Sequence, residues 1–269
     1  MSRVITTGYD AILVREGASR IRRGAAALLV VLLIVAAMSL TGLLDPRRFM
    51  DAWPAIKQLS SEMFPPDFRR FSNWLRPLAD TLAMSIAGTA LAVILSLPIA
   101  LFAAHNTTPS RITYRATRAI LNLLRSIPEL IMGIIFVAMV GFGALPGVLA
   151  VGLHSVGMVG KFFAESFEHV DPRPIEAARA AGASPFQVIW HAVLPQALPQ
   201  LADTAIYRWE YNFRASTVLG AVGAGGIGFE LIAALRVLEY AQVSAILICI
   251  LVCVTIVDGI GAALRNYLK

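Results

Sequence analysis

The chain has 269 residues, of which 57% are hydrophobic and 15% are charged, and its formal net charge is +6. Soluble domains contain about 25% charged residues, so this composition excludes an ordinary soluble globular protein. The excess of Lys and Arg follows the pattern of loops beside membrane spans and gives only weak support for nucleic-acid binding. We therefore expect an all-α membrane protein that does not bind nucleic acid.

Residues 1–77 are expected to form a cytoplasmic tail, a first transmembrane helix and an external segment. Residues 1–23 hold five arginines and two acidic residues, and Gly24–Leu44 follows with 21 residues and no charge. A helix needs about 20 apolar residues to cross the hydrocarbon core. A cleaved signal peptide is the alternative, but its apolar region usually has about 7–15 residues. Residues 45–77 carry the aromatic-rich motifs MFPPDF and FSNWLRP, which suggest a segment at the outer membrane interface.

The next apolar segments predict a second span and then a helical hairpin. Thr81–Ala104 has 24 uncharged residues and suits one span. Leu130–Gly160 has 31 uncharged residues, too many for one ordinary span and too few for two, and glycines and a proline interrupt it at residues 141–147. We predict a hairpin from about residue 119 to about residue 167. It carries Arg125, Glu129, Lys161 and Glu165 into or near the membrane.

Arg125 and Glu129 lie four residues apart around Pro128. Two interpretations stay open for this pair. The side chains either line a transport route or brace a helix that is bent at the proline.

A polar segment, EAARAAGASP, begins at Glu176 and interrupts the apolar pattern. Gly182 suits the left-handed position after a helix end. Ser184 and Gln187 form a capping-box pattern, and Pro185 fits the first turn of the following helix. The sequence thus predicts two short helices joined by a tight corner. Because the first helix is nearly all alanine, another protein could approach its backbone closely.

A fifth span, from about residue 201 to 219, is the least hydrophobic and carries charges. A charge at the centre of a membrane helix costs at least about 2.5–3.5 kcal/mol and usually faces a bundle interior or water. Glu210 and Arg214 are spaced for a helical ion pair, with Arg208 and Asn212 forming a second pair on an adjacent face. These residues either line a route or fix the helix to its neighbours. The polar residues of the span are Arg208, Glu210, Asn212, Arg214, Ser216 and Thr217.

The C-terminal part contains a glycine run and a sixth span. The run GAGGIG begins at Gly223, but its spacing does not match a dinucleotide-binding fingerprint and no strand–turn–helix unit surrounds it. We interpret it as a bent or closely packed helix end. Cys249 and Cys253 lie one turn apart in the span Ala241–Val257 and are expected to serve as packing residues. The four histidines show no metal-ligand spacing, and no residue arrangement suggests catalysis.

Six spans and the loop charges predict the topology. The N-terminal tail, residues 105–118 and the C-terminus are rich in Arg and Lys, whereas the turn at residues 141–147 is uncharged. The positive-inside rule then places both termini and the corner in the cytoplasm. Residues 45–77 conflict with the rule, because they would lie outside yet hold six Lys/Arg.

The segment EAARAAGASPFQVIWHAVLPQALPQ resembles the EAA loop of the membrane subunits of bacterial ABC importers. Three more segments resemble the phosphonate-type permeases: DTLAMSIAGTALAVILSLPIALFAAHN, LRSIPELIMGIIF and YRWEYNFRASTVLGAVGAGGIG. Together they extend the resemblance over residues 78–269, with the coupling loop at about 171–200. The matching elements of the loop are Glu176, Ala177, Ala178, Gly182, Leu194 and Pro195.

The resemblance implies the type I importer fold in the bacterial inner membrane. It implies a permease homodimer that forms the translocation pathway, two ATP-binding subunits that receive the coupling loops, and an extracytoplasmic substrate-binding protein. The expected substrate is a phosphonate, or alternatively phosphate or phosphite. The resemblance also places a gate at the glycine run, at Gly223, Gly225, Gly226 and Gly228.

The chain is not expected to be an enzyme or to hold a cofactor. A P-loop requires glycine, four residues and then Gly-Lys-Ser/Thr. The only Gly-Lys pair is Gly160-Lys161. Ser155 stands where the first P-loop glycine would be required, and Phe162 stands where Ser or Thr would be required. ATP and Mg²⁺ are therefore expected on the partner ATPase. The alternative is a stand-alone secondary transporter that uses the intramembrane Glu/Arg pairs for proton coupling.

Overall fold

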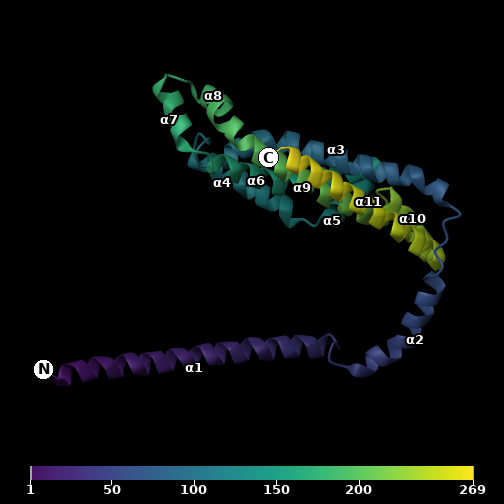
Figure 1. Ribbon diagram of the computed structural model, residues 1–269, viewed down its shortest axis with the longest axis horizontal. Helices are drawn as coiled ribbons and strands as arrows, with labels where there is room; N and C mark the ends of the chain where they lie inside the picture. The colour runs from purple at the N-terminus through teal and green to yellow at the C-terminus, as the bar shows by residue number, and fades with distance from the viewer. Residues whose placement is uncertain (1, 269) are drawn as a thin grey trace. The chain divides into compact units, whose positions relative to one another are not determined.

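The computed structural model describes residues 2–268, with side chains from residue 19 onward except Ile21 (Figure 1). Every regular element within this range is helical. The chain divides into two compact units, residues 1–61 and residues 62–269. The first unit contains α1 (Ser2–Leu40) and most of α2 (Pro46–Met63), and the hydrophobic side chains of residues 28–35 are exposed. The interfacial position expected for residues 45–77 stays a prediction.

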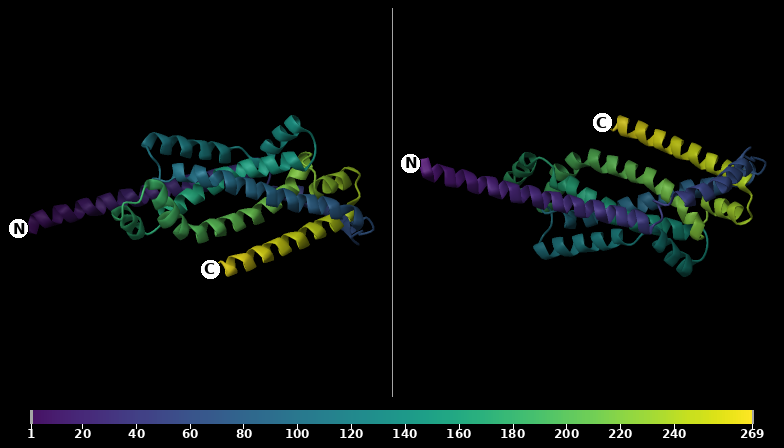
Figure 2. Two further views of the ribbon diagram at one scale, coloured as in Figure 1. Left: turned by 90° about the horizontal axis from the view of Figure 1, so that it is seen from above. Right: turned by 90° about the horizontal axis from the view of Figure 1, so that it is seen from below.

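The second unit is a helical bundle that carries a small protrusion. Figures 1 and 2 show α3, α6, α9 and α11 running roughly along one direction, with α7 and α8 at one end of the bundle and α10 towards the other. Its elements are α3 (Phe71–Ala103), α4 (Arg111–Ser126), α5 (Glu129–Val140), α6 (Ala144–Glu168), α7 (Pro172–Ala180), α8 (Pro185–Val188), a π-helical turn (Ile189–Val193), α9 (Leu194–Leu219), a 3₁₀ turn (Gly220–Val222), α10 (Ile227–Arg236) and α11 (Tyr240–Tyr267).

Within the described residues, four helices are long and apolar enough to cross a membrane. Two pairs of helices bent at a short break, α4 with α5 and α9 with α10, raise this to six if each pair is one span. The six expected spans correspond to these four helices and two pairs.

The third span differs from the expected continuous helix. The axes of α4 and α5 meet at 85°. Ile127 is extended, with φ −85° and ψ 120°, because the ring of Pro128 disfavours the helical conformation of the preceding residue. Arg125 therefore lies in the last turn of α4 and Glu129 begins α5, so they do not form a pair along one helix.

Trp74 is a core residue, although it belongs to the aromatic motif FSNWLRP. Its side chain is only 2% exposed and packs in a core cluster with Ile227, Val243 and Ile246. The aromatic motif therefore starts α3 with a core residue, because the neighbouring helices α10 and α11 cover it.

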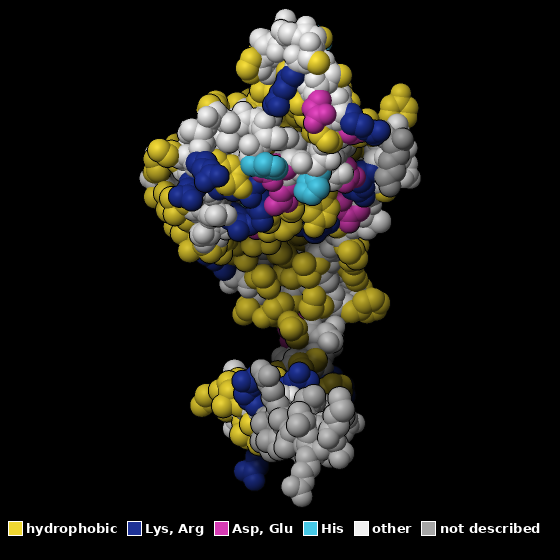
Figure 3. All heavy atoms as spheres, turned by 90° about the vertical axis from the view of Figure 1, so that its left-hand side faces the viewer, with side chains coloured by type: hydrophobic (Ala, Val, Ile, Leu, Met, Phe, Trp, Pro, Cys, Tyr) yellow, Lys and Arg dark blue, Asp and Glu magenta, His cyan; other side chains and the backbone are white. Residues whose placement is uncertain are grey.

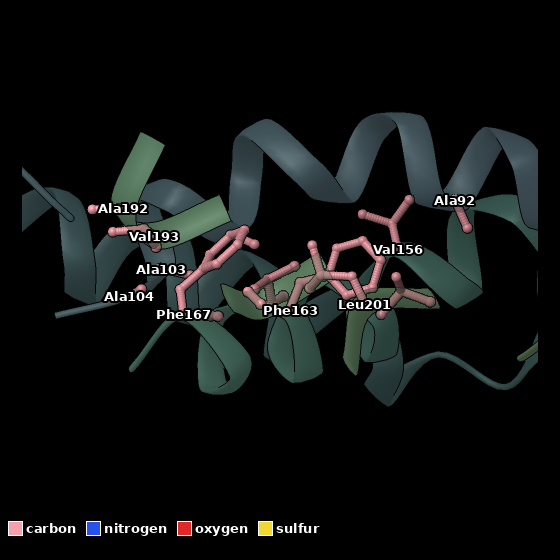
Figure 4. Packing of buried hydrophobic residues seen from close by; sticks show 14 of the residues in the cluster. Ala92, Ala103, Ala104, Val156, Phe163, Phe167, Ala192, Val193 and Leu201 are labelled. Atoms are coloured by element: carbon pink, nitrogen blue, oxygen red, sulfur yellow. The ribbon is translucent and has the colours of Figure 1, made fainter. Parts of the chain in front are cut away.

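The central helix α6 contributes two phenylalanines to a core that it shares with α3, α9 and the protrusion. Phe163 and Phe167 of α6 lie against Ala103 of α3 and Val193 at the base of the protrusion, and Leu201 of α9 joins the same cluster (Figure 4). This core connects the protrusion to the spans, since one set of buried side chains comes from both.

The contact between α6 and α4 depends on Gly157. A Cβ atom at Gly157 would lie 2.8 Å from the backbone nitrogen of Arg125 and 2.8 Å from the carbonyl oxygen of Leu121. We expect Gly157→Ala to lower the free energy of unfolding by about 1–3 kcal/mol, because backbone atoms must move. Gly259→Ala on α11 is the matched control, since no atom lies within 4 Å of its added Cβ. Thermal unfolding in detergent measures both; equal midpoints would contradict the close contact.

Candidate coupling and translocation site

The corner between α7 and α8 has the predicted helix–turn–helix geometry. Gly182 has φ +82°, in the left-handed region. The Ser184 hydroxyl accepts a hydrogen bond from the backbone N–H of Gln187, whose side chain accepts one from the N–H of Ser184, so the capping box is complete. Asp171 caps α7, and its hydrogen bond from the Arg173 side chain lowers the pKa of the Asp171 carboxyl. The cap is therefore ionised at neutral pH, which favours the positive N-terminal end of the helix.

The residues predicted for coupling lie on or beside this corner. Glu176, Ala177 and Gly182 are exposed, and Ala178 is half-buried. Leu194 packs against the core cluster, and Pro195 is exposed at the start of α9. These positions leave the corner surface open to a partner, and their coupling role stays a prediction.

Glu176 makes no ion pair with Arg179 in the described part of the chain. The carboxylate is exposed at the protruding end of the second unit. The Glu176 carboxylate is therefore accessible at the corner surface, and its coupling role stays a prediction.

An exposed aromatic pair on the corner was not among the predicted residues. The rings of Phe186 and Trp190 stack with centroids 6.3 Å apart, and the two residues are 72% and 57% exposed. Their spacing of four residues on a helical segment was the available signal. A stacked aromatic pair offers a partner a rigid apolar surface.

Hydrogen bonds join the corner to α9. The Gln196 side chain of α9 accepts from the backbone N–H of Asp171 at 3.0 Å and donates to the carbonyl of Ala192 at 2.6 Å. Val188 and Val193 are buried in the core cluster. The corner and the start of α9 therefore share hydrogen bonds and one buried core.

A buried polar chain links α9 to α6 and α3. The Arg208 Nε donates to Ser155 Oγ at 2.8 Å, and Ser155 Oγ donates to Asn212 Oδ1 at 2.9 Å. Asn212 Nδ2 donates to Thr89 Oγ1 at 2.8 Å. All four residues are buried, with Arg208 only 4% exposed. The predicted pair of Arg208 and Asn212 thus meets through Ser155 of another helix.

Arg208 retains an unused donor beside a cavity. Its Nη2 atom is buried and has no hydrogen-bond partner. The guanidinium carbon lies 4.2 Å from the ring centroid of Tyr211, a cation–π contact. A cavity of about 150 Å³ is lined by Met158, Val159, Phe162, Thr204, Tyr207, Arg208 and Tyr211. Arg208 is therefore a cavity-lining residue whose positive charge is held in place by Ser155 and the Tyr211 ring.

Glu129 lies close to the same aromatic residue. The Tyr211 hydroxyl donates to Glu129 Oε1 at 3.4 Å, and Glu129 Oε2 is buried without a hydrogen-bond partner. His154 Nε2 lies 4.0 Å from Glu129 Oε2. The structure therefore brings Glu129, Arg208 and Asn212 together around α6, whereas Arg125 is exposed and lines a separate pocket.

The prediction that Glu210 and Arg214 form an ion pair is wrong. Glu210 pairs with Arg265 at 2.5 Å, and Arg214 pairs with Asp258 at 2.8 Å, both across to α11. The two helices approach closely because Gly261 faces Glu210, where an added Cβ would overlap the carboxylate. These contacts support the alternative in which the charges fix α9 to its neighbour.

Ser216 and Thr217 use their hydroxyls within α9. Ser216 donates to the carbonyl of Asn212, and Thr217 donates to the carbonyl of Arg214. Neither hydroxyl therefore extends the polar chain to another helix, and the pathway role of both residues stays a prediction.

The glycine run forms a bent, closely packed helix end, as expected. Gly223, Gly225 and Gly226 have positive φ, and α9 and α10 meet at 43°. The backbone N–H of Ile227 donates to Thr81 Oγ1 of α3 at 2.9 Å. An added Cβ at Gly228 would overlap the carbonyl of Thr217. The gate role of these glycines stays a prediction.

Residues 96–268 match the family described as the binding-protein-dependent transport system inner membrane component. The chain belongs to this family of ABC importer permeases. The permease is 64% identical to a phosphite transport system permease protein of Stutzerimonas stutzeri over 85% of its own length and 83% of that protein. It is 40% identical to the phosphate-import permease protein of Mycolicibacterium smegmatis, over 83% of its own length and 42% of that protein.

Solved structures agree on the fold. The permease matches the inward-facing methionine ABC transporter MetNI with a TM-score of 0.63 and 24% identity, over 73% of its length and 96% of that chain. The type I importer fold expected from the EAA loop is therefore confirmed. The chain is a multi-pass inner membrane component of an importer, with several apolar helices that suit membrane spans.

Proposed function

We propose that this permease conducts a phosphorus oxyanion, namely phosphite, phosphonate or phosphate, and that Arg208 contacts it during transit. The main support is the buried guanidinium of Arg208, a residue that lines the cavity. Its Nη2 atom has no hydrogen-bond partner. A guanidinium is a planar fork of donors that matches phosphorus oxygens. The 64% identity to a phosphite permease supports the same substrate class.

Glu129 moderates the positive charge of this site. Its unpartnered Oε2 and its contact with Tyr211 place an acid near the cation that the substrate meets. A site with Arg208 alone would hold an oxyanion tightly, whereas a neighbouring carboxylate weakens binding and permits release. Asn212 acts as a positioning residue, because its contact with Ser155 fixes the acceptor of the Arg208 hydrogen bond.

The energy for transport comes from separate subunits. The corner of residues 171–200 docks on an ATPase subunit, two of which bind ATP and Mg²⁺, and a second permease copy completes the pathway. An extracytoplasmic binding protein delivers the substrate. Both termini lie in the cytoplasm, and residues 1–77 form an accessory segment before the transport domain of residues 78–269. The exposed corner, fixed to α9 by Gln196, supports this coupling.

Transport in proteoliposomes tests the proposal. We expect uptake of labelled phosphite by the permease only when the ATPase, ATP, Mg²⁺ and the binding protein are all present. Phosphonate and phosphate, offered in separate assays, rank the substrates. Uptake by the permease alone under a proton gradient would overturn the proposal and favour a secondary transporter.

A further inference from the structure

A stripe of cationic and polar residues runs along α4. Arg111, Arg115, Arg118, Asn122 and Arg125 follow one another at intervals of four, three, four and three residues. Residues three and four apart lie on one side of a helix, so all five share a flank.

The side of α4 that faces away from α6 is apolar and exposed. Ile112, Ile120 and Leu123 are 81%, 54% and 64% exposed, and none of them belongs to the core clusters. A helix with such a face beside a row of arginines suits the boundary between lipid headgroups and acyl chains.

The end of this stripe forms a pocket together with α6. The pocket has a volume of about 200 Å³ and is lined by Ala103, Arg118, Leu121, Asn122, Arg125 and Lys161. Gly157 and Gly160 let the backbones of α4 and α6 approach closely, because an added Cβ would meet Arg125 or Leu121. Lys161 directly follows Gly160, so the close approach places cations of two helices around one pocket.

Positive charge in this pocket exceeds the negative charge that faces it. Arg118 is paired with Glu168 at 2.9 Å, and Lys161 lies 3.5 Å from Glu165. Arg125 makes no side-chain hydrogen bond or ion pair among the described residues, and no carboxylate lines the pocket. Three cations and an amide thus surround a space that suits an anion.

We propose that this pocket binds the phosphate headgroup of an anionic phospholipid. Leu121 and Ala103 supply an apolar wall beside the cations, as a glycerophospholipid requires. The exposed face of α4 offers an adjoining surface for acyl chains. Basic pockets between membrane helices recognise anionic headgroups by these features. Figure 3 shows Lys and Arg side chains gathered at the end of the bundle that bears α7 and α8, with hydrophobic side chains beyond them.

Lipid binding by the full permease in detergent micelles tests this site. We expect phosphatidylglycerol, titrated as the probe, to raise the thermal unfolding midpoint, whereas phosphatidylcholine does not. Neutralising two cations of the pocket, one from each helix, by Arg125→Gln with Lys161→Gln should weaken the apparent affinity for phosphatidylglycerol about tenfold or more. The charge-preserving change Arg125→Lys with Lys161→Arg should keep it. Arg236→Gln, at an exposed position of α10, is the control and should leave it unchanged.

Three outcomes would overturn the lipid site. One is equal stabilisation by phosphatidylcholine, and another is unchanged affinity after neutralisation. The third is protection by inorganic phosphite that Arg125→Gln abolishes, which would make the pocket part of the oxyanion pathway. If the double variant fails to fold, Arg125→Gln alone decides, because the Arg125 side chain is exposed and makes no hydrogen bond or ion pair among the described residues. It should weaken phosphatidylglycerol binding several-fold.

Discussion

Gly182→Pro should reduce ATP-driven uptake at least about tenfold while leaving the permease folded. Proline fixes φ near −65° and has no N–H, whereas Gly182 has φ +82° and its N–H donates to the carbonyl of Arg179 at 3.0 Å. The turn must therefore change, and the capping box at Ser184 moves with it. No atom lies within 4 Å of an added Cβ at Gly182, so the bundle is not crowded by the substitution.

Uptake and ATPase activity, measured together in proteoliposomes, separate coupling from folding. The variant should retain its thermal unfolding midpoint and lose the stimulation of ATP hydrolysis by the loaded binding protein. Gly182→Asn is the matched control, because asparagine tolerates the left-handed conformation. Normal coupling in Gly182→Pro would contradict the docking role of the corner.

Glu176→Lys tests the same docking surface by charge instead of shape. The side chain is exposed on α7, so reversal should leave the permease stable. If the carboxylate meets a basic group of the ATPase, Glu176→Lys should reduce coupling, and Glu176→Gln should reduce it less. Unchanged coupling in both Gly182→Pro and Glu176→Lys would leave the corner without a role in energy transfer.

The corner could be predicted from the sequence because its signals are local. Gly182, Ser184 and Gln187 lie within six residues, and each specifies a backbone conformation or cap by itself. The spans were equally accessible, since length and apolar content decide them. The break at Pro128 was considered as a bend, but the presence of a proline does not by itself specify an angle of 85°.

The partners of the charged residues could not be predicted in the same way. Glu210 and Arg214 satisfy the spacing rule for a helical pair, yet Arg265 and Asp258 of α11 take their places. An ion pair within one helix contributes only about 0.2–0.5 kcal/mol. A well-placed group on a neighbouring helix therefore replaces the partner four residues away. Ser155 and Thr89, which bind Arg208 and Asn212, lie on other helices far away in the sequence. No local pattern indicates that they are neighbours.

Arg208→Ala should reduce phosphite uptake by roughly 10- to 100-fold while coupling at the corner stays intact. A hydrogen bond to a charged group contributes about 1.5–3 kcal/mol, and each 1.4 kcal/mol is a factor of ten. Ser155 keeps Asn212 as a partner after the guanidinium is removed, so the remaining polar chain is not orphaned. The Tyr211 ring loses its cation but stays packed beside α6.

Arg214→Ala is the matched control, since it removes the same side chain from the same helix at an exposed position paired with Asp258. We expect Arg214→Ala to lower the thermal unfolding midpoint and Arg208→Ala to lower uptake at unchanged ATPase stimulation. Tyr211→Phe distinguishes the contribution of Glu129 from that of Arg208. It removes the hydroxyl that donates to Glu129 and keeps the ring that contacts the Arg208 guanidinium. If Arg208→Ala and Arg214→Ala reduce uptake only in proportion to the protein that remains folded, Arg208 stabilises the bundle and does not contact the oxyanion.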